Sequence, residues 1–249
     1  MLRPDEVSRF KKNGSLLKSR FLNGDAFIAL DRAIFEIECW PEVLGQHMIY
    51  RSIPRIENVY PFHAGIRAII DGPIHEAMID LFGEPVVLFK DKIHPKPPGA
   101  MGFKAHQDQR TYGNYHDYSI AAGIAIDQTT LENGWLEAVS GRHREGLFGE
   151  PWDTLPNEDA FAWVPVAMNP GDVLFFDGYT PHRSAPNRSN RKRRMMFITF
   201  NRLKDGDHRE RHFADKRVWY PPDIEREPGK KYLTGSERRG FKGMQTRYS

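Results

Sequence analysis

Hydrophobic residues recur at helical spacing in the first third of the chain. In GDAFIALDRAIFEIECWPEV the apolar positions lie on one face of an α-helix; they are Phe27, Leu30, Ala33, Ile34 and Ile37. Asp25 stands where an N-cap is expected, and Pro41 where the helix is expected to end. HAGIRAIIDGPIHEAMIDLFGEP repeats the spacing, with a break at Gly72-Pro73 and an end at Gly83. The pattern predicts a helical layer over about residues 1–84.

The pattern changes after Pro85 to short apolar or alternating runs separated by Gly, Pro or Asn. The runs are VVLFKDKIH, GFKAHQD, YSIAAGIAID, WLEAVSG, AFAWVPVAM, GDVLFFDG and RRMMFITFNRL. Such spacing is typical of a β-sandwich or β-barrel, here over about residues 85–203. From about residue 204 to 249 the chain is polar and charged, which predicts an irregular tail. We therefore expect a single domain over residues 1–249, mainly β with flanking helices, in which the helical layer packs against a central double sheet.

Composition limits the cellular location and the kinds of partner that are expected. No apolar run approaches the roughly 20 residues that cross a bilayer, so no membrane partner is expected. The N-terminus lacks the apolar core of a secretory signal, and the single cysteine, Cys39, rules out an internal disulfide. Both features favour a cytoplasmic location. The net charge of +3 is too small to argue for a nucleic-acid partner, although it is compatible with small anionic substrates. The sequence does not indicate an oligomeric state.

The stretch GFKAHQDQRTYGN contains the first two candidate metal ligands, His106 and Asp108. On an extended backbone these side chains point the same way, because strand side chains alternate with period two. His182 follows a turn, an apolar strand and a second turn in NPGDVLFFDGYTPHRSAPN, which would deliver it to the edge of the β core. Two histidines and one carboxylate leave coordination positions open and suit non-haem Fe(II), which must hold a co-substrate and O2.

Each of these residues taken alone also has a simpler interpretation. A lone His-x-Asp on a strand, or a histidine after a turn, is more often an ordinary polar or surface residue, but their combination in a β context favours a metal. A zinc hydrolase is disfavoured because His-Glu-x-x-His and a cysteine cluster are both missing. A cupin-like isomerase would need His-x-His with a later Glu. The remaining alternative is a non-catalytic jelly-roll binding module with a vestigial metal site, which uses NRKRR and the basic tail to hold nucleic acid or an acidic partner.

Two neighbouring arginines begin the strand after His182. Period two allows only one of Arg193 and Arg194 to face the interior. A fixed guanidinium inside a barrel would bind a carboxylate through two parallel hydrogen bonds. The alternative is a solvated basic turn over residues 191–194.

Several motifs together resemble the phytanoyl-CoA dioxygenase family of Fe(II)- and 2-oxoglutarate-dependent oxygenases. They are KPPG at 96–99, HQD at 106–108, ENGWLEAVSGRH at 132–143 and NPGDVLFFDGYTPHRSAPNRS at 169–189. The resemblance covers about residues 5–205. It implies a double-stranded β-helix (jelly-roll, cupin-like) core, with His106, Asp108 and His182 as the iron ligands.

The resemblance also implies the co-substrates and the residues that bind them. Arg193 lies at the family's spacing after His182 for binding 2-oxoglutarate, and Ser184 matches a hydroxyl that contacts it. Lys90 is the choice for a further contact, with Lys92 and His94 on the same strand face. The implied reaction consumes O2 and 2-oxoglutarate, releases succinate and CO2, and hydroxylates an unactivated C–H bond. Because Asp108 is present, hydroxylation or desaturation is favoured over halogenation.

The residues around the motif indicate the kind of substrate. Those expected near it are polar, basic or aromatic: Gln107, Arg110, Tyr112, Tyr118, Lys92 and Lys104. This lining predicts a small anionic or zwitterionic molecule, although the tyrosines would look the same as packing residues. The tail after residue 200 resembles bacterial members that act on small molecules, including 2-aminoethylphosphonate-type dioxygenases. A natural-product intermediate or an acyl-CoA remains the alternative substrate class.

Overall fold

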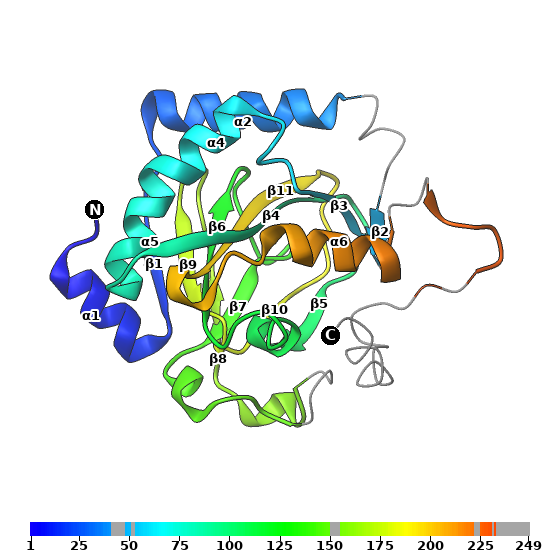
Figure 1. The fold of residues 1–249 in the computed structure, drawn as a ribbon. Coiled ribbons are helices and arrows are strands. Elements are labelled where there is room, and N and C mark those ends of the chain that lie inside the picture. Colours follow the sequence, from blue (N-terminus) through cyan, green and yellow to red (C-terminus); the bar gives the residue numbers. More distant parts are fainter. Residues whose placement is uncertain (41–47, 51–52, 150–154, 222–224, 231, 233–249) are drawn as a thin grey trace, which may run out of the picture.

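Two antiparallel β-sheets form the centre of the molecule (Figure 1). The computed structural model describes residues 1–40, 48–50, 53–149, 155–221, 225–230 and 232. The larger sheet has the strand order β1 (Ser15–Lys18), β9 (Val173–Asp177), β6 (Ser119–Ala125), β11 (Arg193–Arg202), β4 (Val86–Lys96), β3 (Ile53–Glu57) and β2 (Met48–Tyr50). The smaller sheet has the order β5 (Phe103–His106), β10 (His182–Ser184), β7 (Leu136–Val139) and β8 (Trp163–Val166). The predicted jelly-roll core with flanking helices is confirmed.

Helices from the first part of the chain cover the outer face of the larger sheet (Figure 1). They are α1 (Pro4–Asn13), α2 (Gly24–Glu38), α4 (Ala64–Ile69), the π-turn η1 (Ile70–Ile74) and α5 (His75–Phe82). The helical backbone breaks at Gly72, where φ is −94° and ψ is −109°, and α5 ends at Gly83 in the left-handed region, as predicted. The prediction of Asp25 as N-cap of α2 is wrong, because the N-cap is Asn23 and Asp25 lies in the first turn. The helix ends at Glu38, ahead of the predicted Pro41, which itself lies outside the described residues. The layer is not purely helical, because β1, β2 and β3 also belong to it and extend the sheet.

The larger sheet separates two hydrophobic clusters. Its outer face packs on the helices through Ile93, Ile198 and Phe175, which are fully buried. A smaller cluster lies between its inner face and the smaller sheet, and it includes Leu136 of β7: Ala121, Ala125, Leu136, Met168, Leu174, Phe176, Met195 and Phe197. Alternate residues along one strand therefore enter different clusters. The inner cluster is small, and polar side chains occupy the rest of this face.

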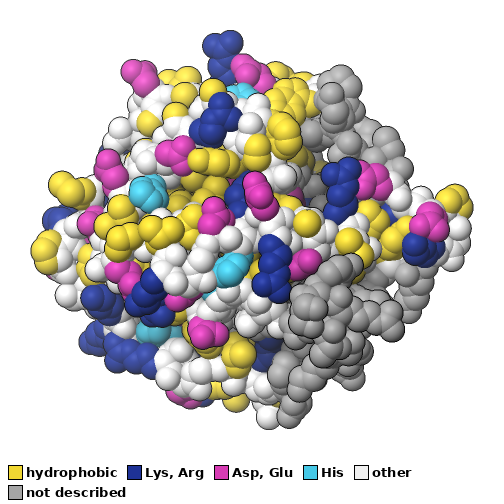
Figure 2. Space-filling view, viewed as in Figure 1, with side chains coloured by type: hydrophobic (Ala, Val, Ile, Leu, Met, Phe, Trp, Pro, Cys, Tyr) yellow, Lys and Arg dark blue, Asp and Glu magenta, His cyan; other side chains and the backbone are white. Residues whose placement is uncertain are grey.

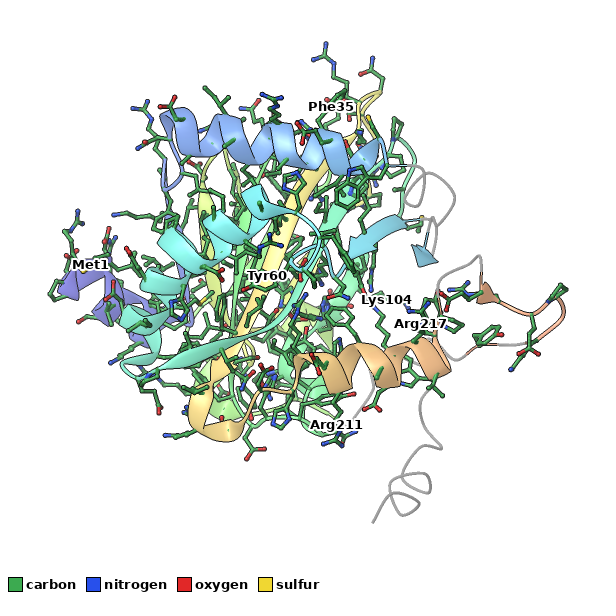
Figure 3. All side chains as sticks on the ribbon, turned by 45° about the horizontal axis from the view of Figure 1, so that its top comes forward. Met1, Phe35, Tyr60, Lys104, Arg211 and Arg217 are labelled. Atoms are coloured by element: carbon green, nitrogen blue, oxygen red, sulfur yellow. The ribbon has the colours of Figure 1, made fainter. Side chains whose placement is uncertain are left out.

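The prediction of an irregular tail is wrong for Arg209–Trp219, which form helix α6. Arg209 of α6 is bonded to Asp91 of β4 at 2.6 Å, and Lys216 pairs with Glu57 of β3. Figure 3 shows α6 lying across the front of the sheets, with the labelled Arg211 and Arg217 on it. The helix docks through ion pairs and its only buried residue is His212, so it has no apolar stripe for a sequence pattern to detect.

Surface charge does not gather by sign over the face drawn in Figure 2, where basic and acidic side chains of the described residues are interspersed. Among the described residues, no helix is both long and apolar enough to cross a membrane.

Candidate metal centre and co-substrate site

Neighbouring strands of the smaller sheet bring the two candidate histidines together. His106 at the end of β5 and His182 at the start of β10 are Cα partners in the antiparallel pairing, and their ring centroids are 4.2 Å apart. Gln107 is extended, so Asp108, the first residue of the 3-10 turn η2 (Asp108–Thr111), returns to the side of His106. The candidate ligand atoms of His106, Asp108 and His182 all lie within 4.8 Å of one another. The sequence prediction that these three residues meet is confirmed.

Backbone carbonyls fix the tautomers of both histidines. The Nδ1 of His106 donates to the carbonyl oxygen of Lys104 at 2.7 Å, and the Nδ1 of His182 donates to that of Thr180 at 3.0 Å. A carbonyl only accepts hydrogen bonds, so in each neutral ring the proton is on Nδ1 and the lone pair is on Nε2. A histidine that binds a metal usually donates its other ring nitrogen in this way. The donor set therefore fits a divalent metal ion.

The charge states of His106 and Asp108 also suit a metal. Burial, helped by the neighbouring His182, lowers the pKa of His106 to about 3, so this ring is neutral. Burial alone would raise the pKa of the Asp108 carboxyl, but His182, Lys92 and Lys90 together hold the pKa below its usual range. A neutral imidazole and an ionised carboxylate are the forms that bind metals.

Arg193 faces the interior and Arg194 faces outward. Arg193 is 2% exposed, and its Nη2 donates to the carbonyl oxygen of Gly134 at 2.9 Å. Arg194 is bonded to the carboxylates of Asp127 at 2.8 Å and Asp31 at 3.0 Å. The alternative of a solvated basic turn is therefore wrong for Arg193. Its Nε has no acceptor among the described residues, which leaves a donor for a ligand.

Lys96 stands beside Arg193 and was not singled out in the sequence. It is the cross-strand partner of Arg193, and its Nζ donates to the Oγ of Ser184 at 3.1 Å and to the carbonyl oxygen of Ala185 at 2.5 Å. Burial and the charge of Arg193 lower the pKa of Lys96 to about 7. The available signal was its position in the alternation of basic residues along β4. Arg193, Lys96 and Ser184 together form one cationic and polar group between the sheets.

Lys90, Lys92 and His94 occupy the same inner face of β4. The Nζ of Lys90 lies 4.4 Å from the centroid of the Tyr112 ring, and the Nζ of Lys92 lies 5.2 Å from that of Phe197. His94 lies between the rings of Phe103 and Phe197. Burial lowers the pKa of Lys92 to about 8 and that of Lys90 well below its ordinary value. The alternation therefore aims this row of basic groups into the interior.

The predicted substrate residues fall in different places. Tyr112 is buried against Lys90, whereas Lys104, labelled in Figure 3, is exposed. Arg110 is 5% exposed and donates to the carbonyl of Phe148.

Two of them are structural. Gln107 is fully buried, because its amide bonds to the carbonyls of Gly146 and Tyr179 and to the N–H of Phe148. Tyr118 packs on Phe82 against the outer cluster, away from the metal site. The structure thus gives no support to a substrate contact by either residue.

A jelly roll that carries two histidines and one carboxylate between its sheets defines the class of non-haem iron oxygenases. Residues 56–195 match the family model for phytanoyl-CoA dioxygenase. The chain belongs to the phytanoyl-CoA dioxygenase family and is therefore an enzyme of the dioxygenase type, which overturns the alternative of a non-catalytic binding module.

Similar proteins include two that are named for phosphonates. The chain is 36% identical over 242 residues to a 2-aminoethylphosphonate dioxygenase from an uncultured bacterium, covering 92% of each chain. It is 36% identical over 229 residues to a methylphosphonate hydroxylase of Gimesia maris, covering 87% of each. Among solved structures, EctD from S. alaskensis with 2-oxoglutarate and 5-hydroxyectoine has a TM-score of 0.69 at 19% identity, over 82% of this chain and 77% of that one. This likeness concerns the fold.

Proposed function

We propose that the protein is an Fe(II)- and 2-oxoglutarate-dependent dioxygenase that hydroxylates a C–H bond of a small organophosphonate and releases succinate and CO2. The observation that carries the proposal is the grouping of His106, Asp108 and His182, with both histidine Nδ1 atoms already bonded to carbonyls. Two relatives that share most of their length with this chain are named for phosphonate substrates.

In this proposal His106, Asp108 and His182 hold the metal through the two Nε2 atoms and a carboxylate oxygen. Three protein ligands leave three positions for the other reactants. When bound, the iron supplies the activation of O2 that is coupled to decarboxylation of 2-oxoglutarate. The carbonyls of Lys104 and Thr180 keep both rings oriented, so the ligand geometry exists before the metal arrives.

Arg193, Lys96 and Ser184 bind the distal carboxylate of 2-oxoglutarate. The planar guanidinium of Arg193 suits a planar carboxylate, and its Nε is available. Ser184 lies two residues after His182 on β10, so both side chains lie on the same face of the strand. Lys96 takes the supporting role expected from sequence for Lys90, because it contacts Ser184 and pairs with Arg193.

The other side chains of the inner face limit the access of water to the site and indicate a small substrate. The ring of Phe176 lies 4.8 Å from that of His182, and Leu174 and Met195 continue the apolar wall of the inner face. A dry wall suppresses side reactions of the activated centre. Beside it, on the same face of the larger sheet, stand the basic residues of β4, which suit a small anion better than the chain of an acyl-CoA.

The test starts with anaerobic binding of Fe(II) and 2-oxoglutarate, followed through the weak visible absorption of the metal–keto acid complex. Wild type is expected to develop the band, and His182→Ala to lose it. His75→Ala is the control, because His75 packs on Phe200 at the outer cluster. With O2 admitted, methylphosphonate and 2-aminoethylphosphonate are expected to stimulate succinate release more than an acyl-CoA does. Absence of the band in wild type, or a preference for the acyl-CoA, contradicts the proposal.

A further inference from the structure

Cationic side chains stand at two separate places along the inner face of β4. Lys96 and its partner Arg193 mark one end. Lys92 and Lys90 lie four and six residues earlier on the same face, which corresponds to about 13 and 20 Å along an extended strand. These separations exceed the length of one small dicarboxylate. The two places therefore call for two different anions.

Lys90 and Lys92 have no hydrogen-bond acceptor and no ion pair within 4 Å in the part of the chain that the structure describes. Their ammonium groups lie over the rings of Tyr112 and Phe197. Both are partly buried, and a cation withdrawn from water without an acceptor costs free energy. Lys96 differs, because Ser184 and Ala185 already accept its protons. The two unpartnered ammonium groups thus indicate a missing anion.

The nearby carboxylates do not fill this role. Glu57 is the cross-strand partner of Lys92, but its carboxylate pairs with Lys216 of α6 and lies 3.9 Å from Arg55. Asp108 belongs to the metal site. A surplus of positive charge therefore remains around Lys90 and Lys92.

The chemistry of the two places favours different anions. A carboxylate is planar and matches the fork of Arg193, whereas a phosphonate is tetrahedral and carries up to two charges. Two ammonium groups are point charges with rotatable donors and can surround such a group. Lys92 and Lys90 also act electrostatically on Asp108, so an anion bound by them would lie on the metal ligand's side of the interior.

We propose that Lys90 and Lys92 form the subsite for the phosphonate group of the substrate, separate from the 2-oxoglutarate subsite of Arg193, Lys96 and Ser184. The inference rests on the proposed function and deepens it. Lys90, expected from sequence to contact 2-oxoglutarate, is thereby assigned to the substrate. Tyr112, whose ring faces the ammonium group of Lys90, forms part of the wall of this subsite.

The experiment compares three Lys→Met variants of the full chain loaded with Fe(II) and 2-oxoglutarate. Methionine is an unbranched side chain of similar length to lysine, and it carries no charge. Lys90→Met and Lys92→Met are expected to raise the Kd and KM for methylphosphonate roughly 30- to 100-fold, while the Kd for 2-oxoglutarate changes less than threefold. Lys96→Met is expected to show the opposite pattern. Lys192→Met, which removes a surface lysine paired with Glu38, is the control and is expected to change neither constant.

One outcome overturns the inference directly: Lys90→Met and Lys92→Met weaken 2-oxoglutarate and leave methylphosphonate binding unchanged. If a Met variant fails to fold, Lys92→Gln and Lys90→Gln are measured in the same way. Failure of the proposed function looks different, because wild type would then release no succinate with any phosphonate. In that case inorganic phosphate is the probe. Phosphate binding that is lost in Lys92→Met supports the anion subsite, and phosphate binding that is unchanged in Lys92→Met overturns it.

Discussion

Charged side chains are paired with opposite charges on the outer face of the larger sheet, whereas several on its inner face lack such partners in the part of the chain that the structure describes. On the outer face, Arg194 is held by Asp127 and Asp31, and Asp91 accepts from Arg209 and from the N–H groups of Val59 and Tyr60. On the inner face, Arg193, the sequence neighbour of Arg194, and Lys92, the sequence neighbour of Asp91, have no carboxylate partner among the described residues. The charged groups named on the outer face are therefore paired within the protein, whereas Arg193 and Lys92 on the inner face are available to a ligand.

This contrast separates stability from function within single strands. Side chains that face the helices contribute burial and paired charge, which stabilise the fold. Side chains that face the smaller sheet keep unpaired cations, which destabilise the ligand-free enzyme and are available to bind anions. Substitutions at adjacent positions should consequently have effects of different kind, and in one case of opposite sign.

The largest expected effect compares Ile198→Ala with Lys92→Met in the metal-free enzyme. Ile198 is fully buried in the outer cluster, so Ile198→Ala is expected to lower the free energy of unfolding by about 2–5 kcal/mol. Lys92→Met removes an unpartnered cation and is expected to raise it by about 1 kcal/mol. Urea denaturation followed by circular dichroism measures both. A loss of stability in Lys92→Met would show that its charge is already satisfied.

The next effect compares the neighbouring arginines. Arg193→Met is expected to weaken 2-oxoglutarate binding about 100-fold, because a bound carboxylate loses its charged donor. Arg194→Met is expected to leave that affinity within threefold and to lower stability by about 1–2 kcal/mol, because Asp127 loses its partner. Anaerobic titration of the visible band gives the affinities. Equal losses of affinity in both variants would contradict the assignment of the two faces.

The smallest expected effect is a pH dependence of stability without ligands. Burial lowers the pKa of Lys92 to about 8 in the folded protein, from an ordinary value of 10.5. Between these values the unfolded chain binds more protons, so the contribution of Lys92 to stability rises with pH across this window and falls as pH drops toward 8. The difference in unfolding free energy between wild type and Lys92→Met, measured at several pH values, isolates it. A difference that does not change with pH would argue against an enclosed ammonium group.

Strand alternation predicted much of the candidate site. It placed His106 and Asp108 on one side, and it required that one of Arg193 and Arg194 face inward. It did not select among the four basic residues of β4, because Lys90, Lys92, His94 and Lys96 all share one face. Only the cross-strand register, which sets Lys96 against Arg193, separates Lys96 from the other three and supports the two proposed subsites.

The misses have a common physical origin. Gln107 and Tyr118 were expected at the substrate because they are close to His106 in sequence. The turns after η2 carry Tyr118 to the outer face, while Gln107 is used by backbone groups of a distant loop. Helix α6 escaped prediction because it docks by ion pairs, and these depend on partners far away in the chain.

Two glycines pack closely against the backbone that follows His182, where no side chain would fit. A Cβ at Gly102 would overlap the carbonyl oxygen of Ser184, and a Cβ at Gly134 would overlap that of Ala185. Two glycines thus act as spacers on either side of the chain that leads away from the second histidine. Any larger residue at either place would push this chain aside and misalign His182 with His106. The relative position of the metal ligands therefore depends on two glycines that are not ligands themselves.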